Sequence, residues 1–148
     1  MNNSYLEKFE KMRIAGKLAS ETLDMLKDFI KPGISTEKID KISYEYIRDN
    51  DGFSAPLYYR GFKKSLCTSL NHVVCHGIPS DRILNEGDTI NVDVTTVVNE
   101  YYGDTSRMFT IGDVSIKAKN LIDATYDSMM KGIKILKPGI KLGDIGFE

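Results

Sequence analysis

The sequence has few residues of the kinds that build disulfide frameworks, zinc knuckles or membrane spans. It contains two cysteines, Cys67 and Cys75, and their spacing is not C-x-x-C, so we expect neither a disulfide scaffold nor a zinc knuckle. No apolar run approaches the ~18 residues of a membrane span, and the N-terminus has no apolar signal segment. The formal net charge of −1 gives no reason to expect a nucleic acid or an anionic membrane as partner. We therefore expect a cytoplasmic protein with reduced thiols.

Helical periodicity is present at both ends of the chain, which is long enough for one domain with its own core. Apolar residues recur at roughly helical spacing over residues 5–30, so we predict a long amphipathic helix that stops at Lys31-Pro32-Gly33. Ser35 or Thr36 is the expected cap of a second helix, which ends at residues 49–52. A third helix is expected from about residue 115 to residue 136.

The middle of the chain is typical of a β-sheet. Four segments are rich in β-branched and aromatic residues and are separated by Gly, Pro, Asn and Asp: residues 54–62, 65–78, 88–97 and 101–111. The short connections between them favour antiparallel pairing. We therefore predict four or five mostly antiparallel strands packed with the helices.

The tetrapeptide Lys-Pro-Gly-Ile occurs twice, starting at residues 31 and 137, which is an offset of 106. A helix followed by Pro-Gly is common, but the apolar positions around the two copies also coincide, which favours an internal repeat. On this interpretation one incomplete domain holds a helix-helix-sheet half over residues 5–112 and the opening helix of a second half over residues 115–148. We therefore expect a truncated reading frame or an expressed fragment.

Two aspartates, Asp93 and Asp104, lie among residues that otherwise suit a sheet core. In a hairpin with a two-residue loop they share one face, directly opposite each other if the loop is 98–99 and diagonal if it is 99–100. Such a pair needs a shared proton, a basic partner or a divalent cation. The motif of an acid-protease dyad is absent, and strand alternation puts Arg107 on the opposite face, so a metal is the most economical explanation. The alternative is that one or both aspartates are solvated turn residues.

Four other residues are candidates for a substrate site. His76 precedes a glycine after an apolar segment, where it is either a structural residue or a hydrogen-bond donor and proton carrier. Tyr59, Phe62 and Cys67 lie close together in the sequence and could line a pocket for a small apolar or thioether side chain. Ordinary sheet core explains these three residues equally well.

Taken together, these residues resemble the N-terminal part of a type I methionine aminopeptidase of the bacterial kind. The resemblance covers nearly the whole chain from Phe9 onward, and it is most specific in "SLCTSLNHVVCHGIP", "GDTINVDVT" and "YYGDTSRMFTIG". It implies the pita-bread α/β (α+β) fold, in which two pseudo-symmetric halves surround a dinuclear metal site. It also implies a monomeric enzyme that removes the initiator methionine from nascent proteins, with the ribosome as a candidate location.

The resemblance also assigns roles to individual residues. Asp93 would be a bidentate ligand of one divalent ion (cobalt, manganese, iron or zinc), and Asp104 would bridge two such ions. His76 would hydrogen-bond the substrate near the scissile peptide, while Tyr59, Phe62 and Cys67 would line the pocket for the methionine side chain. The family's other ligands, one histidine and two glutamates, belong to the second half and have no match here. We therefore expect two ligands of five and no activity from these 148 residues alone.

Two other functions stay open. A non-catalytic module of the same fold could use the apolar pocket to bind a peptide or protein, and it would show no tight uptake of divalent ions. A peptidase that acts on X-Pro bonds has the same fold, but such enzymes commonly carry an extra N-terminal domain, whereas the first helix here begins almost at Met1. Cys67 and the "VCHGIP" block also favour the methionine enzyme.

Overall fold

The computed structural model describes residues 3–148. These residues form two compact units, which divide between Asp113 and Val114. The elements are α1 (Asn3–Leu26), α2 (Thr36–Asp49), β1 (Phe53–Ser54), the 3₁₀ helix η1 (Tyr59–Gly61), β2 (Cys67–Leu70), β3 (Thr89–Val98), β4 (Tyr101–Thr110), α3 (Ile116–Lys134) and α4 (Leu142–Phe147). None of the helices in this described stretch is long and apolar enough to cross a membrane. The expected organisation as one incomplete domain, with parts 5–112 and 115–148, stays a prediction.

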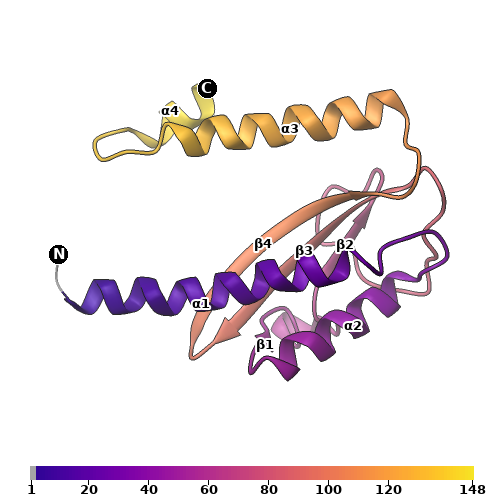
Figure 1. The fold of residues 1–148 in the computed structure, drawn as a ribbon, viewed down its shortest axis with the longest axis horizontal. Helices are drawn as coiled ribbons and strands as arrows, with labels where there is room; N and C mark the ends of the chain where they lie inside the picture. Colours follow the sequence, from indigo (N-terminus) through magenta and orange to yellow (C-terminus); the bar gives the residue numbers. More distant parts are fainter. Residues whose placement is uncertain (1–2) are drawn as a thin grey trace. The chain divides into compact units, whose positions relative to one another are not determined.

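Strand β3 is the centre of a four-stranded sheet in the first unit (Figure 1). Strand β4 pairs with β3 along its whole length on one edge. The other edge of β3 pairs with two short strands. Strand β1 pairs with Thr96 and Val97 of β3, and strand β2 pairs with Ile90 to Asp93 of β3. All of these pairings are antiparallel, which confirms the prediction from the short connections.

A two-residue turn joins β3 and β4 and fixes their register. Val98 pairs with Tyr101, so Asn99 and Glu100 form the loop. Their φ angles are 49° and 68°, and positive φ at both central residues defines the type I′ turn that suits the twist of a hairpin. Of the two loops that the sequence allowed, the structure therefore has the one at residues 99–100.

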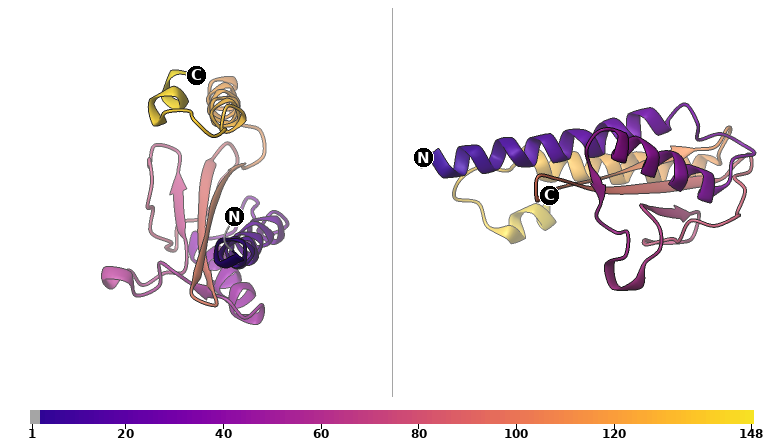
Figure 2. Two further views of the ribbon diagram at one scale, coloured as in Figure 1. Left: turned by 90° about the vertical axis from the view of Figure 1, so that its left-hand side faces the viewer. Right: turned by 90° about the horizontal axis from the view of Figure 1, so that it is seen from below.

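Helices α1 and α2 cover one face of this sheet (Figure 2). Alternate side chains of β3 face these helices and are fully buried, as strand geometry requires when only one face is covered. Thr96 Oγ1 also donates a hydrogen bond of 2.8 Å to the Ala15 carbonyl on α1. The core of the first unit contains Leu18, Leu23, Leu26, Ile39, Ile47, Ile90, Val92 and Val94.

The predicted helix boundaries are nearly correct. Helix α1 ends at Leu26 rather than at Ile30. At this end the Phe29 and Ile30 N–H groups both donate to the Leu26 carbonyl, each at 3.0 Å. Helix α2 begins after Ser35, whose side chain accepts a hydrogen bond from the Lys38 N–H at 3.1 Å. This confirms the expected cap, because a serine at this position satisfies one of the free N–H groups of the first turn.

Two segments that the sequence suggested as strands are largely irregular. In residues 54–62, Tyr58 and Arg60 have φ angles of 70° and 47°, and the Tyr58 N–H donates to the Phe62 carbonyl at 2.7 Å. This closes a tight loop around η1 instead of a strand. In residues 65–78, the strand ends at Leu70 because Asn71 adopts a φ of 50°, a left-handed conformation that asparagine tolerates well.

The second unit contains α3 and α4. The Ser115 side chain caps α3 by accepting from the Ala118 N–H at 3.2 Å. The Lys-Pro-Gly-Ile turns at residues 31–34 and 137–140 have the same geometry, with glycine φ angles of 93° and 96°. In each turn the isoleucine N–H donates to the lysine carbonyl, at 3.3 Å and 3.4 Å. The two turns therefore share their local geometry, and the internal repeat stays a prediction.

Candidate metal centre

Asp93 and Asp104 lie on the face of the β3–β4 hairpin that helices α1 and α2 do not cover. Asp93 is paired with Ser106, and Asp104 is paired with Thr95. The two aspartates are therefore diagonal neighbours on one face, at a separation of roughly 7–8 Å between the backbones. Asp93 is half-buried and Asp104 is exposed. The hairpin thus brings together the two carboxylates that the sequence predicted to share a face.

The protein environment is unfavourable for the ionised form of Asp93. Burial and the nearby Asp104 carboxylate raise the pKa of Asp93, while His76 acts in the opposite direction. Removing a carboxylate from water and placing it beside a like charge both favour the protonated form. A cation bound between the two aspartates would reverse both effects.

Arg107 does not neutralise the two aspartates. Its guanidinium forms an ion pair with Asp24 on α1, with an Nη1–Oδ1 distance of 2.8 Å. Arg107 is paired with Val92, so it lies on the helix-covered face of the hairpin. This confirms the prediction from strand alternation and leaves the pair of carboxylates on the other face without this partner.

Cys67 is a neighbour of Asp93 on the adjacent strand. It is paired with Asp93 across β2 and β3 and is buried. Burial and, next, the Asp93 carboxylate raise the pKa of the Cys67 thiol to about 11. The thiol therefore stays protonated near neutral pH, which suits a soft lining side chain and does not suit a nucleophile.

His76 lies in the loop that follows β2, rather than directly after a strand as the sequence suggested. The chain folds back so that the Thr68 N–H donates to the Gly77 carbonyl at 2.8 Å, and the Gly77 N–H donates to Ser69 Oγ at 3.1 Å. A Cβ on Gly77 would overlap the Thr68 carbonyl oxygen, so this close approach requires glycine. His76 itself is exposed, with a φ of 54°.

A hydrogen-bonded network that the sequence did not reveal anchors the start of this loop. The Asp88 carboxylate accepts from the Asn71 side chain and from the Asn85 N–H, each at 2.9 Å. Asn71 in turn accepts from the Thr89 N–H at 3.0 Å. The only signal in the sequence was an aspartate at the start of a predicted strand segment, and this position does not specify which groups the carboxylate binds.

The Asp88 network predicts a specific dependence of stability on pH. The Asn71 side chain, followed by the Asn85 N–H, lowers the pKa of Asp88. The ionised carboxylate therefore stabilises the fold above the ordinary aspartate pKa of about 3.9, and this contribution is lost as the pH falls toward the lowered folded-state value. We expect Asp88→Asn to lower the free energy of unfolding at pH 7 by about 1–2 kcal/mol and to weaken its acid dependence. Urea titrations of the wild type and the variant at pH 3 to 7 test this. An acid dependence that is the same in both would contradict it.

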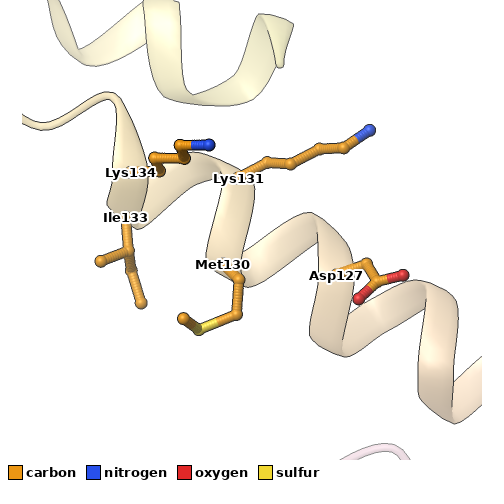
Figure 3. Close-up of a pocket in the computed structure, with 5 residues that line it drawn as sticks. All are labelled: Asp127, Met130, Lys131, Ile133 and Lys134. Atoms are coloured by element: carbon orange, nitrogen blue, oxygen red, sulfur yellow. The ribbon is translucent and has the colours of Figure 1, made fainter.

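The segment that carries Tyr59 and Phe62 is anchored to α2. The Asp40 carboxylate accepts from the Ser65 N–H and hydroxyl, each at 2.7 Å, next to an ion pair between Lys64 and Glu37. Tyr59 is exposed and Phe62 is half-buried. Neither side chain lines the depression shown in Figure 3. The depression shown in Figure 3 is lined by α3 side chains that project from residues 127–134 instead.

The sequence matches the family model of metallopeptidase family M24 over residues 10–148. The chain belongs to metallopeptidase family M24. It is 55% identical over 139 residues to the methionine aminopeptidase of Rickettsia prowazekii, an alignment that covers 94% of this chain and 54% of that protein. The chain thus spans about half the length of the curated relatives it matches.

Solved structures of M24 relatives confirm the predicted fold class. The crystal structure of methionine aminopeptidase from Rickettsia prowazekii superposes with a TM-score of 0.93, at 55% identity over 95% of this chain and 57% of that one. The enzyme from Thermotoga maritima superposes with a TM-score of 0.91, at 33% identity over 94% of this chain and 56% of that one. The aligned part of this chain therefore has the fold class of these M24 proteins, the pita-bread fold.

The M24 family is a metallopeptidase family, and the open face of the hairpin fits part of a metal site. Two carboxylates share this face, and burial, followed by the Asp104 carboxylate, raises the pKa of Asp93. Carboxylate oxygens are ligands that divalent cations accept. Within residues 3–148 the structure has no group of three or more His, Cys, Asp or Glu side chains that could hold a metal ion. The described residues therefore present two carboxylates on this face, which is fewer than such a group needs.

Proposed function

We propose that these 148 residues supply the first half of a metal-dependent methionyl aminopeptidase, which removes the N-terminal initiator methionine from nascent proteins. The observation that carries this proposal is the register of the hairpin, which puts Asp93 and Asp104 on one open face. The identity of 55% to a methionine aminopeptidase supports the same reaction. When bound, two divalent ions would supply Lewis acidity to the reacting carbonyl and water.

The residues of the chain have distinct roles in this proposal. Asp93 would chelate one ion, and Asp104 would bridge the two. His76 would hydrogen-bond the substrate near the scissile peptide; its place beside Asp93 is supported by its effect on the pKa of that carboxylate. Tyr59, Phe62 and Cys67 would contact the methionine side chain, and the protonated thiol of Cys67 suits a thioether.

The proposed partner is the N-terminal peptide of a newly made protein in the cytoplasm, with the ribosome as a candidate location and with the enzyme acting as a monomer. Cobalt, manganese, iron and zinc all accept carboxylate ligands, and two aspartates do not discriminate among them. A small second residue in the substrate is part of the same proposal, since it follows from the resemblance to the methionine enzymes.

Metal uptake tests the proposed function. Manganese added to the ¹⁵N-labelled chain should broaden the amide signals of β3 and β4 around residues 93 and 104, because a paramagnetic ion acts over short distances. Asp93→Ala should abolish this broadening without unfolding the chain. A chain with no manganese response would favour the alternative of a non-catalytic peptide-binding module.

We expect no methionine release by the 148-residue chain alone. Two carboxylates are an incomplete ligand set for a dinuclear site, so the chain should show no turnover of a Met-Ala-Ser peptide in the presence of cobalt or manganese. The assay compares the wild-type chain with Asp93→Ala. Turnover that Asp93→Ala abolishes would show that this ligand set suffices and would contradict the prediction.

A further inference from the structure

The two candidate ligands differ in how the protein holds them. Thr95 Oγ1 lies 2.9 Å from Asp104 Oδ1. A carboxylate can only accept, so the threonine hydroxyl is the donor. Thr95 is directly opposite Asp104 in the register of the hairpin and lies two residues after Asp93 on the same face. The hydroxyl thus belongs to the open face that carries both carboxylates.

No comparable contact restrains Asp93. Within residues 3–148 no protein group donates a hydrogen bond to its carboxylate. Both of its oxygens are therefore free to bind one ion, whereas one oxygen of Asp104 is already held by the protein. This asymmetry matches the proposed roles, in which Asp93 chelates and Asp104 must keep an orientation that serves two ions.

Threonine is well suited to hold a carboxylate at this position. Its branched Cβ restricts χ1, so the hydroxyl has a fixed direction, and its methyl group suits a strand. Valine has nearly the same shape but lacks the donor, and serine keeps the donor. The role of the hydroxyl can therefore be separated from the packing of the side chain.

We propose that Thr95 is a positioning residue for the metal centre: its hydroxyl holds the Asp104 carboxylate in the orientation in which it binds a divalent ion together with Asp93. This inference rests on the proposed function of the two aspartates as metal ligands. Groups that hydrogen-bond a metal ligand fix its orientation, and their loss typically weakens metal affinity by about 10–100-fold.

The first measurement tests the positioning without metal. Three-bond couplings from Asp104 Cγ to the backbone nitrogen and carbonyl carbon of the ¹³C,¹⁵N-labelled 148-residue chain report its χ1. We expect one dominant rotamer in the wild type and in Thr95→Ser, and averaging over rotamers in Thr95→Val. A single rotamer that persists in Thr95→Val would overturn the inference, because Asp104 would then be held by something else.

The second measurement tests the consequence for the metal. Manganese titrations of the same chains, followed by the broadening of β3 and β4 amides, should give an apparent Kd at least about 10-fold weaker for Thr95→Val. Thr95→Ser should bind as the wild type does, and so should Thr110→Val, a control on the same face of β4. Unchanged affinity in Thr95→Val, with binding lost in Asp93→Ala, would overturn the inference and leave the proposed function intact. No binding by the wild type would instead overturn the proposed function.

Discussion

Replacing Asp93 with asparagine is expected to stabilise the metal-free chain and to abolish its response to manganese. At pH 7 and in the presence of a chelator, we expect Asp93→Asn to raise the free energy of unfolding by up to about 1 kcal/mol, the scale of a cross-strand pair. This corresponds to an increase of about 4 °C in the melting temperature of a domain of this size. The wild type should gain stability when manganese is added, whereas the variant should not.

Asp93→Asn is expected to stabilise the metal-free chain and to remove the stabilisation by manganese. The reason is that the negative charge of Asp93 lowers the stability of the metal-free fold but is needed to bind the cation. Burial and the Asp104 carboxylate raise the pKa of Asp93, so the folded chain holds this proton more tightly than the unfolded chain does. Ionisation of Asp93 therefore lowers stability as the pH rises from about 4, its ordinary pKa, through the raised folded-state value. A bound cation stabilises the ionised form and adds its own binding free energy to that of folding.

Thermal melts at several pH values, with a chelator and with manganese, test this prediction. The difference between Asp93→Asn and the wild type should disappear in the chelator below about pH 4, where both side chains are neutral. Asp28→Asn removes an exposed carboxylate outside the sheet and should change neither the melting temperature nor the manganese response. A lower melting temperature for Asp93→Asn at pH 7 would contradict the argument, because it would show that the carboxylate has a stabilising partner in the fold.

The shared face of the two candidate metal ligands could be predicted from the sequence because it depends on local rules. Strand alternation and an even-numbered loop place Asp93 and Asp104 on one face for any two-residue turn, and the same alternation assigns Arg107 to the other face. The sequence allowed two turns, at residues 98–99 and at residues 99–100, and these local rules do not choose between them. Local periodicity was therefore sufficient to predict that the two carboxylates share a face. It was insufficient to predict whether they are directly opposite each other or diagonal.

The substrate-binding candidates were harder to place because long-range hydrogen bonds decide their conformation. Residues 54–62 are rich in strand-forming aromatic residues, yet the anchor from Asp40 to Ser65 and the left-handed Tyr58 make this segment a loop. In the same way, His76 is placed by the return of Gly77 to β2. Neither contact has a signature in the local sequence, since the partners of the first are 25 residues apart.

The other large effect is expected at Gly103, where the β4 backbone lies against α1. A Cβ on Gly103 would overlap the Ala15 carbonyl group and the Gly16 nitrogen. These are backbone atoms, so no side chain can rotate away, and Thr96 holds the same turn of α1 through the Ala15 carbonyl at 2.8 Å. We expect Gly103→Ala to lower the free energy of unfolding by about 3 kcal/mol, the upper part of the range for overpacked cores, and denaturant titration measures it.

Gly16→Ala is the matched control for Gly103→Ala because it adds the same methyl group on the facing element. A Cβ at Gly16 meets nothing within 4 Å, and alanine favours a helix over glycine by up to about 1 kcal/mol. Gly16→Ala should therefore stabilise the chain while Gly103→Ala destabilises it. Equal and small effects of the two substitutions would show that α1 can move away from the hairpin and would contradict the prediction.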